Sequence, residues 1–151
     1  MSLEQKIMSD LKAAMKSKDK AAVRGIRAIK AAILLAKTSG KDGSLDEEAE
    51  VKMLQKLIKQ RKDSIEIFAK QGRDDLANIE QEEVEVLQQY LPAQLGEEEL
   101  KDIIDKIIIT SGAQGMKDMG KVMGMANKEL AGKADGKTIA SIVKNKLQND
   151  N

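Results

Sequence analysis

The chain has 151 residues, of which 34% are charged and 41% belong to the hydrophobic set AVILMFWYC, and its net charge is +1. This apolar content argues against wholesale disorder, and the near-neutral charge creates no long-range field toward nucleic acid or membrane. Cysteine and histidine are both absent, which excludes disulfides, thiolate or imidazole zinc sites and Cys- or His-dependent nucleophilic catalysis. Because Phe68 and Tyr90 are the only aromatic residues, base stacking on aromatic platforms is nearly excluded as well.

The N-terminal fifteen residues contain no secretory signal, because Glu4, Lys6, Asp10 and Lys12 interrupt every apolar segment there. The longest purely apolar stretch, residues 31–36, is far shorter than the roughly 20 residues that a bilayer-spanning helix needs. The sequence therefore predicts a soluble cytoplasmic protein with no membrane partner.

Composition and periodicity together predict an all-α fold. The strong helix formers Ala, Leu, Lys, Glu, Gln and Met dominate, and no stretch shows the alternation of β-branched residues that is typical of strands. Seven helices are expected, over about residues 3–16, 20–38, 46–71, 74–91, 97–110, 117–130 and 135–147.

Apolar residues at helical spacing predict which side of each helix is buried. The expected core residues are Val23, Ile26, Ile29, Ile33, Val51, Leu54, Ile58, Ile65, Phe68, Leu76, Ile79, Val86, Leu87, Tyr90, Leu100, Ile103, Ile104, Ile107, Ile108, Ile139, Ile142, Val143 and Leu147.

Local signals mark several helix ends. Ser44 and Glu47 have the spacing of a capping box before the third helix. Gly72 is expected to end that helix, and Asp74 to cap the fourth.

Pro92 is the only proline, and it falls where the helical pattern lapses. Since the residue before a proline is pushed out of the α region, we expect a boundary between two domains at this point. The prediction is an N-terminal helical bundle at residues 1–92, followed by a small C-terminal three-helix domain at residues 96–151.

A phosphate-binding loop is the first candidate site. Residues 132–138 read Gly-Lys-Ala-Asp-Gly-Lys-Thr, but the motif needs a glycine five positions before the Gly of Gly-Lys-Thr, where this chain has Ala131. The motif also follows a strand, whereas a helix is predicted here. The ordinary interpretation is a connection in which Gly132 ends one helix and Asp135 caps the next.

The sixth predicted helix carries the stronger candidate. At about 100° per residue, Lys117, Lys121 and Lys128 fall on one stripe, with Gly120 and Gly124 beside it. Two interior glycines cost a helix about 1 kcal/mol each relative to alanine. Close approach by a packed neighbouring helix, or by an external phosphate chain, would offset that cost.

Charge supports the second alternative, since residues 117–146 contain seven lysines against three acidic residues. This local excess is typical of a phosphate-contacting surface, although composition alone favours a solvated lysine face. The methionines at positions 116, 119, 123 and 125 suit core filling better than an adaptable partner groove. The candidate nucleic-acid-binding residues are Lys117, Lys121, Lys128, Lys133, Lys137, Gly120, Gly124, Gly132 and Gly136.

No catalytic residue, metal site or cofactor is predicted. The many carboxylates between residues 63 and 85 show no spacing that singles out a catalytic or metal-binding pair, so a solvated helix face is the expected use.

Several blocks of the sequence resemble the bacterial YqeY family. They occur in the family's order and cover nearly the whole chain: residues 60–68 (QRKDSIEIF), 72–76 (GRDDL), 90–95 (YLPAQL), 97–100 (EEEL), 118–123 (DMGKVM) and 132–137 (GKADGK). The last two match a signature that YqeY proteins share with the tail of the B subunit of glutamine-dependent aminoacyl-tRNA amidotransferases.

The resemblance implies an all-helical fold and kinship with a domain that contacts tRNA, while phosphorylation and amide transfer occur elsewhere in the larger enzyme. It also implies the label of a carbon–nitrogen ligase with glutamine as amide donor, for which this chain shows no catalytic apparatus. Two positions depart from the family: Lys133 stands where arginine is frequent, and Gly96 where a serine cap is common.

Three hypotheses remain. The favoured one is a non-catalytic, tRNA-associated accessory protein that binds through its C-terminal domain. The alternatives are a protein–protein adaptor for an amidotransferase or a synthetase, and a component with carbon–nitrogen ligase activity.

Overall fold

The computed structural model describes residues 1–39 and 45–149, and every regular element in these ranges is helical. The all-α prediction is therefore confirmed. The elements are α1 (Leu3–Ser17), α2 (Lys20–Ser39), α3 (Glu47–Lys70), α4 (Asp74–Gln88), α5 (Glu97–Ser111), the 3₁₀ turn η1 (Met116–Asp118), α6 (Met119–Glu129) and α7 (Gly136–Asn149). None of these helices has both the length and the apolar character that crossing a bilayer requires.

The chain divides into two compact units, Met1–Leu91 and Pro92–Asn151. The division falls at the single proline. Residues 92–95 count with the second unit because Leu95 N–H donates a hydrogen bond to the Lys133 carbonyl, at 3.0 Å.

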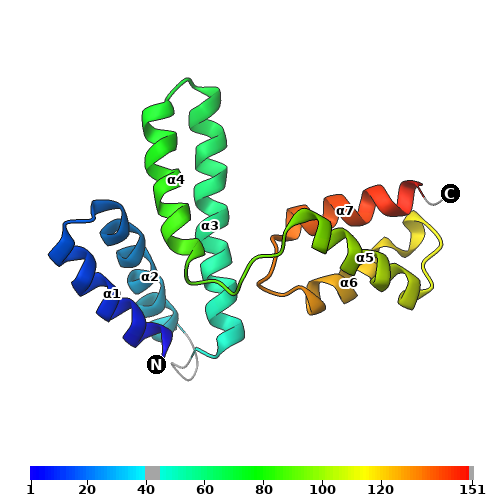
Figure 1. Ribbon diagram of the computed structural model, residues 1–151, viewed down its shortest axis with the longest axis horizontal. Helices are drawn as coiled ribbons and strands as arrows, with labels where there is room; N and C mark the ends of the chain where they lie inside the picture. The colour runs from blue at the N-terminus through cyan, green and yellow to red at the C-terminus, as the bar shows by residue number, and fades with distance from the viewer. Residues whose placement is uncertain (40–44, 150–151) are drawn as a thin grey trace. The chain divides into compact units, whose positions relative to one another are not determined.

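In the first unit, α2 lies between α1 and α4, and α3 packs along α4 (Figure 1). The apolar stripes predicted for the second and third helices supply the centre of this core. Its members are Ile7, Ala14, Ile26, Ile29, Ile33, Leu54, Ile58, Val84, Val86 and Leu87.

The far end of the α3–α4 pair lies beyond this core. Ile79 was predicted to be buried, but its side chain is 43% exposed, and Ile67 is 54% exposed. Within the described residues of the first unit, α3 and α4 pack at that end against each other alone (Figure 1), so the helical period overestimates how much is covered there.

Gly25 sets the distance between α2 and α4. A Cβ added at this buried position would lie 2.6 Å from Val86 Cγ1 and 2.8 Å from Val86 Cβ. Real Cβ atoms do not approach other carbons so closely, and a β-branched valine in a helix has essentially one rotamer. The absence of a side chain at Gly25 therefore allows the two helices to pack.

Two predicted caps differ from the structure. Asp46 is the N-cap of α3, where its carboxylate accepts a hydrogen bond from Ala49 N–H at 2.8 Å; Ser44, the predicted cap, lies outside the described residues. Asp74 is the first helical residue of α4, and Arg73 holds the cap position without a side-chain hydrogen bond. There Asp74 complements the helix dipole instead of capping.

Gly72 ends α3 as predicted. Its φ is +71°, and Arg73 N–H donates to the Phe68 carbonyl at 2.9 Å. This is the left-handed closure that glycine adopts without steric cost.

The second unit is a three-helix bundle around a core that includes the stripe predicted for α5. Its buried residues are Leu100, Ile104, Ile107, Ile108, Val122, Ala126, Leu130, Ala134, Ile139, Ile142, Val143 and Leu147. Met119, Met123 and Met125 pack partly buried against this cluster, which agrees with the core-filling interpretation for these three methionines, whereas Met116 is 37% exposed.

Tyr90 ties the end of the first unit to its beginning. Its hydroxyl donates a hydrogen bond to Asp10 Oδ2 at 2.6 Å, and Lys6 Nζ lies 5.3 Å from the centre of its ring. Burial, and then the bond to Asp10, raise the pKa of the Tyr90 phenol above its ordinary value.

We expect Gly25→Ala to destabilise the first unit by about 1–3 kcal/mol, as overpacking of a filled contact does. The measurement is urea denaturation followed by circular dichroism. Val86→Ala removes the clashing methyl groups, so the double variant should lose less than the sum of the two single losses. Strictly additive losses would show that the Gly25–Val86 contact is not the cause.

We also expect stability to fall as pH rises above the ordinary tyrosine pKa of about 10. The unfolded chain then loses the phenolic proton before folded Tyr90 does, so the unfolded state is favoured progressively. Since the chain has one tyrosine and no tryptophan, the near-ultraviolet tyrosinate band reports Tyr90 alone. Tyr90→Phe should be less stable by about 1 kcal/mol near neutrality, and its disadvantage should shrink at alkaline pH; a constant disadvantage would contradict the assignment.

Candidate nucleic-acid interface

The five candidate lysines are all exposed, but they do not form one stripe. Lys117 lies in η1, and the helix begins only at Met119. Asp118 explains the difference, because its carboxylate accepts a hydrogen bond from Gln114 N–H at 2.9 Å and holds a tighter turn before α6. The predicted start of this helix at Lys117 is therefore wrong, and only Lys121 and Lys128 share a face of α6.

Lys121 has a structural partner. Its Nζ donates a hydrogen bond to the carbonyl of Ser111, the last residue of α5, at 3.0 Å. Carbonyls at a helix C-terminus lack partners within the helix, so this ammonium group completes the end of α5. Lys121 is thus partly occupied within the unit.

Lys128 lies in the last turn of α6, Lys133 in the connection to α7, and Lys137 in the first turn of α7; we call these three residues the α6–α7 cationic turn. None of the three forms an ion pair with another residue in the described part of the chain. Lysine ammonium groups in this state act as point-charge partners for phosphate oxygens.

The backbone of this turn is fixed from two directions. Gln94 Nε2 donates to the Gly132 carbonyl at 2.7 Å, and Leu95 N–H donates to the next carbonyl, that of Lys133. Asp135 caps α7 as predicted, since its carboxylate accepts from Thr138 N–H at 2.7 Å. A rigid backbone therefore presents flexible cationic side chains to solvent.

The candidate glycines fall into two groups. Gly120, Gly124 and Gly136 are exposed, and an added Cβ at each would meet no atom within 4 Å. A packed neighbouring helix therefore does not explain them, and the approach of an external group remains. Gly132 is buried with φ +77°, so it shapes the turn. The prediction that Gly132 lines the binding surface is therefore wrong.

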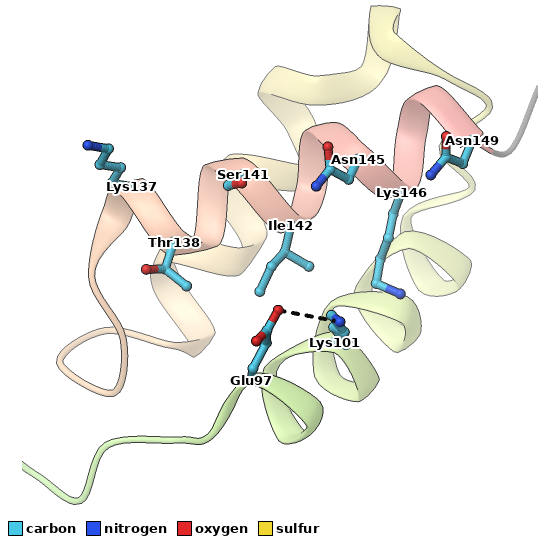
Figure 2. A pocket seen from close by; sticks show the side chains of 9 residues that line it. All are labelled: Glu97, Lys101, Lys137, Thr138, Ser141, Ile142, Asn145, Lys146 and Asn149. Atoms are coloured by element: carbon cyan, nitrogen blue, oxygen red, sulfur yellow. Dashed lines mark ion pairs between the residues drawn. The ribbon is translucent and has the colours of Figure 1, made fainter.

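A polar cleft of about 600 Å³ lies between α5 and α7 (Figure 2). Its lining residues are Glu97, Lys101, Lys137, Thr138, Ser141, Ile142, Asn145, Lys146 and Asn149.

Two of the three cations in the cleft are already neutralised. Lys101 pairs with Glu97 at 3.4 Å (Figure 2), and Lys146 on α7 pairs with Asp105 on α5 at 2.6 Å. Lys137 stands at one end of the cleft and belongs also to the α6–α7 cationic turn. The cleft thus adds polar groups beside that turn but little net charge.

Local sequence patterns predict few of the residues that hold this region together. The spacing of Glu97 and Lys101 signals an i,i+4 pair, but the Lys146–Asp105 pair and the Gln94 bond each join residues about 40 positions apart. Among the residues described, no group of three acidic side chains is placed to hold a metal ion. The arrangement offers exposed cationic side chains beside a polar cleft.

We expect Gly124→Ala to raise the free energy of unfolding by about 1 kcal/mol, since alanine is the better helix former and open space surrounds the position. Gly132→Ala is the matched control. It should destabilise the same unit by at least about 1 kcal/mol, because alanine is strained at a positive φ. Thermal melts followed by circular dichroism measure both; a loss of stability in Gly124→Ala would reveal a packing role for that glycine.

Known proteins are similar to this chain over nearly its whole length. The sequence profile of the family described as Yqey-like protein matches residues 4–147. A relative from Pyrenophora tritici-repentis (strain Pt-1C-BFP), named altered inheritance of mitochondria protein 41, mitochondrial, is 36% identical over 132 residues, which cover 85% of this chain and 71% of the relative.

Proteins of the same name from two other organisms match shorter stretches. The one from Eremothecium gossypii is 39% identical over 87 residues, covering 58% of this chain and 48% of the relative. The one from Lachancea thermotolerans is 40% identical over 85 residues, covering 56% and 46%. The matched stretches span about half the length of these two relatives. Because the family profile extends from the first helix to the last, the chain belongs to the YqeY-like family.

Proposed function

We propose that this protein is a tRNA-associated binding protein without catalytic activity of its own, which contacts RNA phosphates through the α6–α7 cationic turn. The observation that carries the proposal is the state of Lys128, Lys133 and Lys137. All three are exposed and without an ion pair in the described structure, on a backbone that Gln94 and Leu95 hold in place.

The exposed glycines support the same interpretation. Gly124 on α6 and Gly136 at the start of α7 leave the backbone uncovered beside these lysines. A phosphodiester chain can approach such a backbone more closely than one covered by side chains. The glycines thus give a physical use to positions that cost the helix stability.

The expected mode of binding is weak and depends on salt. Lysines contact phosphate oxygens, which position a nucleic acid without reading its sequence. The chain's near-lack of aromatic side chains removes the stacking by which proteins usually recognise unpaired bases. Three phosphate contacts would make the logarithm of the binding constant fall with the logarithm of salt concentration with a slope of about −2 to −3.

The other hypotheses from the sequence remain proposals of lower rank. An adaptor role for an amidotransferase or a synthetase would have to use the exposed face of α6, because Met119, Met123 and Met125 are engaged with the core. Carbon–nitrogen ligase activity would need groups beyond those described above. The cytoplasmic location also stays a prediction, since the names of the relatives refer to mitochondria.

The test is a fluorescence-anisotropy titration of labelled bulk tRNA at low salt. Lys128→Glu combined with Lys133→Glu should weaken binding by about tenfold or more and reduce the salt slope by about 2, because two phosphate contacts are lost. The matched control is Lys56→Glu with Lys59→Glu on α3, which changes the net charge equally on exposed positions outside the turn.

Gly124→Ala adds a test of close approach in the same titration. It should weaken tRNA binding although it stabilises the helix. Absence of wild-type binding at micromolar protein, or an equal loss in the α3 control, would contradict the proposal. Recovery of a synthetase or an amidotransferase in a pull-down after nuclease treatment would favour the adaptor instead.

A further inference from the structure

The hairpin of α1 and α2 carries more uncompensated positive charge than the C-terminal unit. Residues 3–39 contain nine basic and three acidic residues, and the two helices lie side by side, joined by a tight turn (Figure 1). The near-neutral total hides this excess, because residues 74–88 of α4 contain six acidic residues and no basic one.

The three acidic residues of the hairpin are all engaged. Glu4 pairs with Lys37 at the open end of the hairpin. Asp10 accepts the hydroxyl hydrogen of Tyr90. Asp19 accepts from Ala22 N–H at 3.1 Å, as the cap of α2.

Three of the nine basic residues are engaged as well. Lys37 is paired with Glu4, Lys6 lies over the Tyr90 ring, and Arg24 pairs with Glu82 on α4 at 2.7 Å. The other six are exposed and form no ion pair with any described residue; we call them the hairpin cations. They are Lys12, Lys16, Lys18, Lys20, Arg27 and Lys30.

The turn of the hairpin keeps lysine at two positions that local structure disfavours. Lys18 has φ +60°, and it is the one residue other than glycine with a positive φ in the described structure. Glycine would adopt this conformation without steric cost. Lys20 is the first residue of α2, at the positive end of the helix dipole, whereas α3, α4 and α5 place acidic residues there.

The positive φ of Lys18 closes α1, because its N–H donates to the Ala14 and Met15 carbonyls, but this closure does not need a lysine side chain. Residue choices that oppose local preference are expected at functional positions. Lys16, Lys18 and Lys20 lie two positions apart in the sequence, so the distance from the first Cα atom to the last is at most about 14 Å. The turn therefore concentrates three flexible ammonium groups in a small area, with Lys12 and Arg27 farther along the two helices.

We infer that the hairpin cations form a second phosphate-binding surface, centred on the α1–α2 turn, which contacts the backbone of the same class of RNA. The identity of the polyanion as RNA rests on the function proposed above. The surface itself rests on charge and geometry in the first unit, which that proposal does not use.

An RNA backbone fits this surface better than an anionic membrane does. Membrane-surface helices place apolar residues along the length of the face that enters the lipid, beside their cations. Here Leu34 and Leu35, which are 64% and 68% exposed, lie near the C-terminal end of α2, away from the turn. On α1, Met8 and Met15 are exposed as well, at 57% and 55%, but Met15 alone lies next to the lysines of the turn.

The experiment titrates labelled bulk tRNA with the full chain over a range of potassium chloride concentrations. The hairpin variant, Lys16→Glu with Lys20→Glu, should weaken binding by about tenfold and reduce the salt slope by about 2. The Lys56→Glu, Lys59→Glu control on α3 should change both much less. Lys18→Gly should keep or raise the melting temperature and still weaken binding, a combination that a purely structural role of Lys18 does not produce.

The outcomes separate this inference from the proposed function. A hairpin variant that binds like the α3 control overturns the inference, and the C-terminal site stands if Lys128→Glu with Lys133→Glu still weakens binding. A loss confined to the hairpin variant supports the inference and overturns the C-terminal site. Absence of wild-type tRNA binding overturns both. Hairpin-dependent binding to phosphatidylserine vesicles, together with tRNA binding that the hairpin variant leaves unchanged, overturns the inference alone.

Discussion

A chain of almost zero net charge can bind an anion only if its acidic residues are kept away from some of its basic ones. In this protein the largest acidic excess and the largest basic excess lie on different helices. Six acidic residues and no basic one lie between residues 74 and 88, and three more acids occupy residues 97–99 at the start of α5. Because fields are screened within about 10 Å at moderate ionic strength, an approaching polyanion senses the local excess and not the total.

Apolar packing keeps this separation in place. The absence of a side chain at Gly25 lets α2 approach α4 at Val86, and Arg24 then meets Glu82 across the same pair of helices. On the opposite side of α4, Arg61 of α3 and Glu83 form a partly buried pair at 3.9 Å. The acidic helix thus forms ion pairs with two arginines, while the six hairpin cations form no ion pair with any described residue.

The sequence predicts the parts of the fold that depend on periodicity. The stripe that includes Leu100, Ile104 and Ile107 is long and regular, and all three residues are buried. Ile79 follows the same rule but is exposed, because burial also needs a neighbouring helix of sufficient reach. Caps are harder to predict, since Ser44, Asp46 and Asp74 are all chemically suitable and only the exact start of each helix decides among them.

The candidate site shows the same limit. Gly124 and Gly132 are both glycines near lysines, and the sequence treats them alike. One is open to solvent, and the other is buried with a positive φ and accepts a hydrogen bond from Gln94. That bond joins residues 38 positions apart, so no local pattern announces it. The hairpin cations are hidden for a related reason, because in the net charge of the whole chain they are cancelled by the acidic residues of α4.

The distribution of arginine and lysine indicates what kind of contact the free cations make. Three of the four arginines are held in ion pairs with Glu82, Glu83 or Asp75. Arg73 shows the two-point geometry that suits arginine's planar fork, since its Nε and Nη2 donate to the two carboxylate oxygens of Asp75. Arginine is also the group that reads guanine edges. Apart from Arg27, the cations left free at the hairpin and at the α6–α7 turn are lysines, whose flexible point charges follow a phosphate backbone without fixing a register on the bases. The protein therefore holds three of its four arginines in its own ion pairs and exposes mostly lysines at the two surfaces proposed to bind phosphate.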